Sequence, residues 1–175
     1  MQVTEPRSAP RSSAVPPPVV VMGVSAVGKT TVGIALARLL RAEFVDADDL
    51  HPAASIAKMT AGIPLTDDDR IPWLGVVGRA LRPGTVTACS ALKRSYRDLL
   101  RTEAPTTLFV HLEADPAWIA ARAAERPAHF MPPSLLRSQL DTLEPLGWDE
   151  AGTTLVVDAE PTVLATRAAA GLGLL

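Results

Sequence analysis

The fold is decided by the stretch Val19-Val20-Val21-Met22-Gly23-Val24-Ser25-Ala26-Val27-Gly28-Lys29-Thr30-Thr31. Its first part is an apolar, β-branched run that predicts a buried strand, and a helical pattern follows. Between them lies the spacing G-x-x-x-x-G-K-[ST], which is typical of a loop that binds the phosphates of a nucleoside triphosphate. Gly23 and Gly28 permit backbone angles that turn successive N–H groups toward phosphate oxygens. The partial positive charge at the start of the following helix favours the same anion.

Each residue type in this loop suits a contact with the nucleotide. Lys29 would reach the outer phosphates, and the hydroxyl of Thr30 would hold Mg²⁺. A plain glycine turn between a strand and a helix is the alternative, but it does not explain a lysine and a hydroxyl at these offsets. We therefore predict a nucleotide-binding loop formed by Gly23, Val24, Ser25, Ala26, Val27, Gly28, Lys29, Thr30 and Thr31.

Composition narrows the class of protein. The chain has 175 residues, the size of one domain, and its 47% hydrophobic content is that of a globular protein. A formal net charge of -2 provides no basic field for a nucleic acid. No apolar run approaches the length of a membrane span. The single cysteine, Cys89, excludes an internal disulfide and fits a reducing compartment. We expect a cytoplasmic protein that binds neither nucleic acid nor membrane.

Residues 1–18 differ in composition from the rest of the chain. They contain several prolines among Ser, Arg and Ala, so they are predicted to form a disordered tail before a single folded domain over residues 19–175. The apolar centre of a secretory signal is missing. The arginines leave an organelle-targeting segment as the alternative.

Strand and helix patterns alternate along the domain. Asp67, Asp68 and Asp69 are expected to cap a helix that starts near Ile71, with Pro72 in its first turn. Residues 126–133 are predicted to be a loop. Helices are expected over residues 29–40, 55–59, 71–81, 93–103, 115–125, 134–143 and 161–170, and strands over 19–22, 42–46, 85–89, 107–112 and 154–158. This alternation predicts a three-layer α/β/α sandwich on a mostly parallel sheet.

Polar residues gather where the predicted strands end. The phosphate-binding loop follows the first strand, Asp46 and Asp48 the second, and residues 90–94 the third. In parallel α/β sheets, ligands bind beyond the carboxyl ends of the strands. The sequence therefore predicts one site at this edge of the sheet.

Six further stretches resemble the gluconokinase family. They are Asp46-Ala47-Asp48-Asp49-Leu50-His51-Pro52, Lys58-Met59 with Gly62-Ile63-Pro64-Leu65, Asp67-Asp68-Asp69-Arg70-Ile71-Pro72-Trp73-Leu74, Cys89-Ser90-Ala91-Leu92-Lys93-Arg94 with Tyr96-Arg97-Asp98, His129-Phe130-Met131, and Ser138-Gln139 with Thr142-Leu143-Glu144. The resemblance implies a P-loop kinase fold of the nucleoside-monophosphate-kinase type, with a five-stranded parallel sheet of order 2-3-1-4-5. It also implies a homodimer that uses ATP and Mg²⁺ to phosphorylate the 6-hydroxyl of D-gluconate. Ala26 and Val27 depart from the family, which usually has Gly, and Ser or Gly, at these positions.

Phosphoryl transfer requires an acceptor hydroxyl in line with the γ-phosphate, and neutralisation of charge. We assign Asp48 to the acceptor hydroxyl and Asp46 to Mg²⁺ through water, and the exchange of these two roles stays open. Asp49 is expected to cap the following helix. Lys29, Asp48 and Arg126 form the expected catalytic set.

The resemblance also implies a set of residues that bind the acid. Arg70 would hold the carboxylate in a bidentate contact, unless the three preceding aspartates neutralise it at the surface. Lys93 is a second candidate cation, with a solvated lysine as the alternative. His51 would donate to a hydroxyl or merely pack beside Pro52, and Gln139 would bond sugar hydroxyls.

A lid is expected over residues 126–133, where it would exclude water from the reaction. In related kinases, arginines such as Arg122 and Arg126 stack on adenine and close over the phosphates, although solvated helix arginines are common. His129 on this loop would contact the acid. Cys89 is expected to be a buried strand residue, and Trp73 and His111 to be structural.

Two other functions compete with the gluconate kinase. One is a kinase of another small polyol acid such as shikimate, but the segments 49–52 and 89–93 are not expected in such a protein. The other is a non-catalytic nucleotide-binding regulator, which the retention of Lys29, Thr30, Asp48 and Arg126 disfavours.

Overall fold

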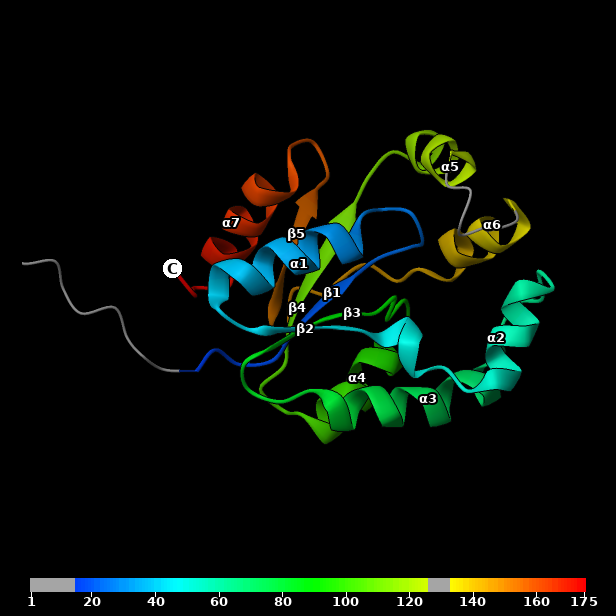
Figure 1. Ribbon diagram of the computed structural model, residues 1–175, viewed down its shortest axis with the longest axis horizontal. Helices are drawn as coiled ribbons and strands as arrows, with labels where there is room; N and C mark the ends of the chain where they lie inside the picture. The colour runs from blue at the N-terminus through cyan, green and yellow to red at the C-terminus, as the bar shows by residue number, and fades with distance from the viewer. Residues whose placement is uncertain (1–14, 126–132) are drawn as a thin grey trace, which may run out of the picture.

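The computed structural model describes residues 15–125 and 133–175, and it shows a central sheet between two helical layers (Figure 1). The sheet has five strands in the order β2-β3-β1-β4-β5, and every adjacent pair is parallel. This order confirms the prediction. The elements are β1 (Val19–Met22), α1 (Lys29–Leu40), β2 (Glu43–Asp46), the 3₁₀ helix η1 (Ala47–Leu50), α2 (Ala53–Thr60), α3 (Asp67–Ala80), β3 (Thr85–Ala88), α4 (Arg94–Glu103), β4 (Leu108–Glu113), α5 (Pro116–Ala124), α6 (Pro133–Thr142), β5 (Gly152–Val156) and α7 (Pro161–Gly171).

The central position of β1 in the sheet explains its apolar sequence. Val19 pairs with Val86 of β3 on one side and with Leu108 of β4 on the other. All four residues of β1 are fully buried, because helices cover both faces of the sheet. An unbroken apolar run, without polar alternation, is therefore what this position requires.

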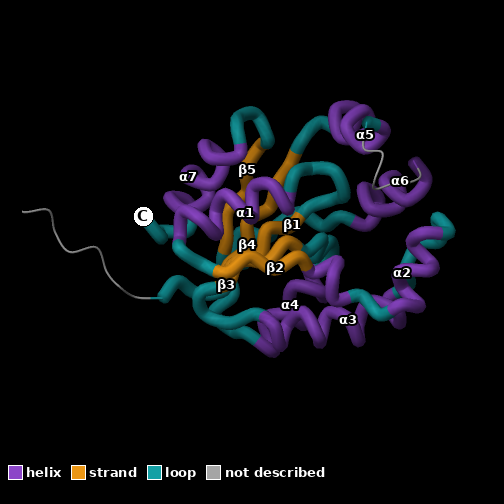
Figure 2. The backbone as a smooth tube through the Cα atoms, in the orientation of Figure 1, coloured by secondary structure: helices purple, strands orange, loops and turns teal. Residues whose placement is uncertain are grey.

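Helices cover the two faces of the sheet in pairs (Figure 2). α1 and α7 pack on one face, where Leu36 and Leu164 join a large apolar cluster. α3 and α4 pack on the other, where Leu74 and Leu100 belong to a second cluster. α2, α5 and α6 lie at the end of the sheet where the loop after β1 emerges (Figure 1). Two layers of helices thus fix the sheet, and three helices surround the predicted site.

The start of the described chain corrects the predicted tail. The carbonyl of Pro16 accepts a hydrogen bond of 2.7 Å from the Gly84 N–H, and that of Pro18 one of 2.9 Å from the Leu108 N–H. Proline has no N–H to donate, but its carbonyl can still accept a hydrogen bond. These two bonds hold Pro16 and Pro18 against the domain. Residues 1–14 lie outside the described part.

Helix α3 begins one turn earlier than the sequence suggested. Its N-cap is Thr66, whose hydroxyl accepts from the Asp69 N–H while the Asp69 carboxylate accepts from the Thr66 N–H. This reciprocal capping box takes precedence over a start near Ile71. Pro72 consequently lies inside the helix and not in its first turn, so the carbonyl of Asp68 lacks its usual helical donor.

Candidate functional site

The loop between β1 and α1 has the backbone that its glycines predicted. Gly23 and Gly28 have φ values of 140° and 113°, and Ala26 has 64°. A Cβ at position 23 would lie 2.8 Å from the Leu112 carbonyl oxygen, so this position requires glycine. Lys29 folds over the loop, and its Nζ donates to the Val24 carbonyl at 2.9 Å. The loop therefore holds its shape by internal contacts, with the lysine at its mouth.

The side chains of Thr30 and Asp46 meet beside the loop, where β2 ends. The Thr30 hydroxyl donates to one carboxylate oxygen of Asp46 at 3.0 Å, and the Asp48 N–H donates to the other at 3.1 Å. Asp46 is the N-cap of η1, and α2 begins after Pro52 without a side-chain cap, so the predicted capping role of Asp49 is wrong. Because Mg²⁺ prefers oxygen ligands and keeps several waters, the pair Thr30 and Asp46 suits this ion.

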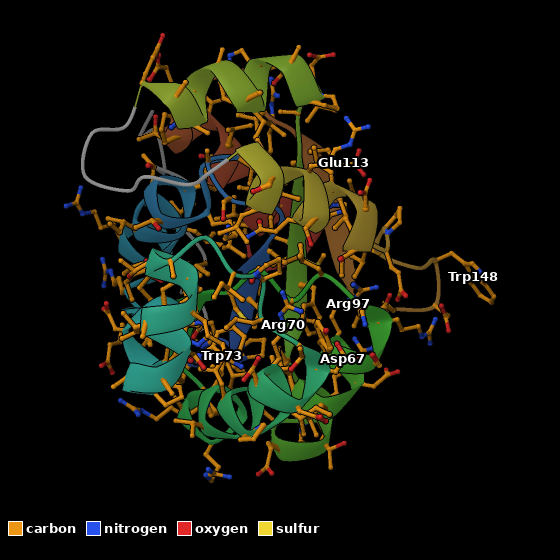
Figure 3. The ribbon with its side chains drawn as sticks, turned by 90° about the vertical axis from the view of Figure 1, so that its right-hand side faces the viewer. Asp67, Arg70, Trp73, Arg97, Glu113 and Trp148 are labelled. Carbon is orange, nitrogen blue, oxygen red and sulfur yellow. The ribbon has the colours of Figure 1, made fainter. Side chains whose placement is uncertain are left out.

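A pocket opens on the other side of the loop. It brings together four of the predicted substrate residues, Asp48, His51, Arg70 and Gln139, next to Lys29. Arg70 and Trp73 both come from α3 (Figure 3). The remaining lining residues are Ser25, Met59, Pro64, Leu65, Trp73, Ser90, Leu135 and Ser138. A cation, a carboxylate and neutral polar groups thus share one concave surface beside the phosphate-binding loop.

His51 stacks on Trp73 with ring centroids 4.0 Å apart and an angle of 12° between the planes. Burial lowers the pKa of His51, more than the nearby Asp48 carboxylate raises it, and Arg70 lowers it further. The imidazole is therefore neutral near pH 7, and its buried Nδ1 has no hydrogen-bond partner among the described residues. Trp73 is buried, as predicted, and donates to the Ala47 carbonyl at 2.9 Å. It also lines the pocket, which the sequence did not indicate.

The aspartates that precede Arg70 are paired with lysines. Lys58 lies 2.6 Å from a carboxylate oxygen of Asp69, and Lys93 lies 2.9 Å from one of Asp67. Arg70 makes no ion pair with any carboxylate of the described residues, so its charge stays available in the pocket. Its guanidinium lies 5.9 Å from the Tyr96 ring centre.

Lys93 occupies a different place from the one predicted. It does not line the pocket with Arg70, because its ammonium is held by Asp67, whose carboxylate also accepts from the Tyr96 hydroxyl. These hydrogen bonds lower the pKa of Asp67, and the contact with Asp67 raises that of Lys93. The pair therefore links α3 to the start of α4, next to the acceptor pocket.

Gln139 reaches the phosphate-binding loop from α6. Its side-chain oxygen accepts a hydrogen bond of 2.7 Å from the Ser25 N–H. The sequence predicted a contact of Gln139 with the acid and gave no sign of this bond, because the two residues are 114 positions apart.

A groove on the α7 side of the loop was also missed. It runs from Gly28 and Thr31 to the connection between β5 and α7, residues 157–161. Trp118 and Arg122 of α5 line it, and the Arg122 guanidinium lies 5.1 Å from the Trp118 ring centre. Trp118 is 41% exposed, and its spacing of one helical turn from Arg122 was the available signal. An exposed aromatic ring under a guanidinium suits the flat base of a nucleotide.

Arg97 forms a buried network that the sequence did not indicate. Its fully buried guanidinium holds the Glu150 carboxylate at 2.8 Å and 2.7 Å. It also donates to the carbonyls of Ala91, Leu92, Glu144 and Pro145. Ala91 has a positive φ of 41°, so this contact stabilises an unfavourable turn directly after the pocket residue Ser90.

Two predicted site residues, Arg126 and His129, and the predicted lid up to residue 132, lie outside the described residues. Burial raises the pKa of Cys89 to about 12, which agrees with a packing role. His111 is fully buried on β4, and burial lowers its pKa, against the opposite effect of Glu113.

Comparison with known proteins gives the relationships. A model of the shikimate kinase family matches residues 25–144. The gluconokinase of Gluconobacter oxydans is 47% identical over 151 residues, which cover 83% of this chain and 85% of that protein. The thermosensitive gluconokinase of Escherichia coli is 47% identical over 132 residues, covering 71% and 70%.

Solved structures agree with these sequence matches. A gluconokinase from Sinorhizobium meliloti superposes with a TM-score of 0.84 at 45% identity, over 91% of this chain and 93% of that one. A shikimate kinase from Acinetobacter baumannii reaches a TM-score of 0.61 at 23% identity, over 88% and 91%. The second similarity shows a shared fold alone. The chain therefore belongs to the gluconokinase family, built on the fold of the shikimate kinases.

Proposed function

We propose that the protein is an ATP-dependent gluconokinase, which transfers the γ-phosphoryl group to the 6-hydroxyl of D-gluconate. The observation that carries this proposal is the pocket in which Arg70 and Asp48 lie beside Lys29 at the phosphate-binding loop. The Arg70 guanidinium, which has no ion pair among the described residues, matches a carboxylate, and the Asp48 carboxylate matches a hydroxyl that must lose a proton. The similarity to gluconokinases supports the same acceptor.

On the donor side, the loop from Gly23 to Thr31 would cradle the phosphates of ATP, and Lys29 would neutralise their charge. The groove beside Trp118 and Arg122 would take the base. Thr30 and Asp46 would hold Mg²⁺, which supplies positive charge at the phosphate oxygens when bound. Arg126 is proposed to close over the phosphates from the lid.

On the acceptor side, Asp48 is the proposed base or orienting group for the reacting hydroxyl. Its carboxylate lies in the pocket, whereas Asp46 is bonded to Thr30, and this difference supports the assignment of the acceptor role to Asp48. Arg70 would bind the carboxylate of the acid, and neutral His51 would bond a hydroxyl. His129 would complete the contact when the lid closes, and Lys93 would act through its pair with Asp67.

An acceptor panel tests this function. ADP release with D-gluconate, its epimers and shikimate should show turnover with gluconate well above the rate with ATP alone, and little with shikimate. Lys29→Ala should abolish turnover while its circular dichroism spectrum and melting temperature stay close to those of the parent. Preferred turnover of shikimate, or an active Lys29→Ala variant, would contradict the proposal.

The role of Arg70 has its own test. Loss of a charge-assisted contact worth about 1.5–3 kcal/mol should raise the KM for gluconate in Arg70→Ala by about 10- to 150-fold. The KM for ATP should change little. Arg79→Ala removes an exposed arginine from the same helix and serves as the control. Equal effects on both substrates would count against binding of the carboxylate by Arg70.

We also propose that the protein acts as a homodimer in the cytoplasm, as the family resemblance suggests. Within residues 15–125 and 133–175, no helix is both long and apolar enough to cross a membrane. Sedimentation equilibrium should give twice the monomer mass, and a monomer at micromolar concentration would contradict the dimer.

A further inference from the structure

The side-chain amide of Gln139 has only one orientation that its surroundings allow. The Ser25 N–H is a donor, so the atom 2.7 Å from it must be the carbonyl oxygen of the amide. The NH₂ end then points away from the loop backbone. It makes no hydrogen bond with any residue in the described part of the chain, although Gln139 lines the pocket that holds Asp48 and Arg70. As far as residues 15–125 and 133–175 are concerned, both donor hydrogens of the amide are therefore available to a ligand in the acceptor pocket.

Both ends of this contact are held in place. On the loop side, the Gly23 N–H donates to the Ser90 carbonyl at 3.3 Å. On the α6 side, Leu135 and Leu136 are buried. Beyond the helix, the Glu144 N–H donates to the Leu92 carbonyl at 2.8 Å. Because α6 is fixed at its end and through its apolar side, the Gln139 amide occupies a defined position relative to the phosphate-binding loop.

We propose that Gln139 positions the acceptor acid relative to this loop. Its oxygen stays on the Ser25 N–H, and its NH₂ donates to an oxygen of the bound acid, so the acid is placed at a set distance from the transferred phosphoryl group. This inference rests on the proposed function for the class of acceptor. It adds a direct link between the donor loop and the acceptor, which neither Arg70 nor Asp48 provides.

The link predicts a specific failure when it is lost. In productive turnover, the bond between the γ-phosphorus and the β–γ bridging oxygen breaks, a bond to the acceptor oxygen forms, and the hydroxyl proton leaves to Asp48. Water can replace the acceptor, and inorganic phosphate is then released. A displacement of about 1 Å can cost about 100-fold in rate, so a loosely held acid would lose to water more often. The ratio of ADP to phosphorylated acid would then exceed one.

Three substitutions test the link. Gln139→Leu removes both hydrogen bonds, and Gln139→Asn keeps the amide but shortens the side chain by one methylene. Gln139→Glu retains an acceptor for the Ser25 N–H and loses the donor hydrogens. Asp141→Leu, which changes an exposed residue of the same helix, is the matched control. For each variant, ADP, phosphorylated acid and inorganic phosphate are measured together with the melting temperature.

We expect kcat/KM for gluconate to fall by at least about 10-fold in all three variants, the loss of one hydrogen bond to a charged or polar partner. The KM for ATP should stay within about 3-fold, less than one such bond is worth. The ADP ratio should rise above one in these variants and stay at one in Asp141→Leu. The Glu and Asn variants keep the experiment decisive if the Leu variant fails to fold.

A ratio of one and near-parental kcat/KM in the Glu and Asn variants would overturn the inference. Effects of equal size on the kinetic constants for ATP and for gluconate would also overturn it, because they would indicate a general defect of the phosphate-binding loop. Failure of the proposed function has a separate signature, namely a parental enzyme that does not phosphorylate gluconate.

Discussion

Ala26 is a residue of the phosphate-binding loop that has a Cβ and a positive φ. Its φ of 64° lies in the left-handed region, which costs a residue with a Cβ about 1–2 kcal/mol. The backbone at this position has the conformation that glycine adopts most readily. The chain therefore keeps the loop shape at a cost in strain.

Ala26→Gly should relieve this strain. The gain is offset by about 0.4–1 kcal/mol because glycine has more freedom in the unfolded chain, so the free energy of unfolding should stay equal or rise slightly. By contrast, Ala120→Gly, at an exposed site inside α5, should lower it by about 1 kcal/mol. Urea unfolding of both variants checks the pair. If Ala26→Gly lowers the free energy of unfolding as much as Ala120→Gly does, Ala26 is not strained.

Helix α3 carries the acceptor side of the site. Its first turn holds the capping box of Thr66 and Asp69, and Lys58 of α2 donates to the same Asp69 carboxylate. Hydrogen bonds from Lys58 and Thr66 lower the pKa of Asp69 to about 2. Arg70 follows directly, so the contacts that start the helix also set the direction of the proposed carboxylate-binding residue.

Thr66→Ala should reduce the free energy of unfolding by about 0.5–2 kcal/mol, the usual cost of a lost N-cap. It should also raise the KM for gluconate, because the first turn next to Arg70 loosens. Thr66→Ser keeps the hydroxyl and should restore both values. As a control, Thr102→Ala, which removes a hydroxyl bonded inside α4, should change stability by less than about 0.5 kcal/mol. An unchanged KM for gluconate in Thr66→Ala would show that the N-cap does not influence the position of Arg70.

At the scale of the whole molecule, the Arg97 network joins parts that are distant in sequence. It connects α4, the turn after β3, and the segment between α6 and β5. Burial raises the pKa of Glu150, but bonds from Arg97, Gly147 and Arg101 outweigh this effect and lower it from 4.5 to about 2. Removal of one partner from a buried pair leaves an uncompensated charge, which costs about 3–5 kcal/mol.

Glu150→Gln should therefore destabilise strongly, and the effect should depend on pH. Since the folded-state pKa is depressed, the contribution of Glu150 is present above the ordinary value of 4.5 and is lost as pH falls toward about 2. The difference in unfolding free energy between parent and variant should thus be constant from pH 7 to about 5 and shrink below that. Glu43→Gln breaks an exposed pair with Arg82 and should cost at most about 1 kcal/mol. If the difference in unfolding free energy between parent and Glu150→Gln does not shrink below about pH 5, the depressed pKa of Glu150 is contradicted.

The fold was largely predictable because its signals are local. The strand and helix periods and the spacing from Gly23 to Thr30 each lie within a few residues. The strand order came from the family resemblance. Less predictable were contacts across the chain, such as Gln139 with Ser25 and Arg97 with Glu150, since no spacing in sequence encodes them. The same holds for Lys93, whose partner Asp67 became apparent only when α3 and α4 were placed together.

The three tryptophans lie in three different environments. Trp73 lies in the acceptor pocket, Trp118 lines the groove proposed for the base, and Trp148 is 99% exposed on a loop that projects from the body (Figure 3). A buried indole and a solvated one emit at different wavelengths, so each ring carries its own fluorescence signal. Variants that retain one tryptophan at a time would therefore report the arrival of acid and of nucleotide separately, without any added label.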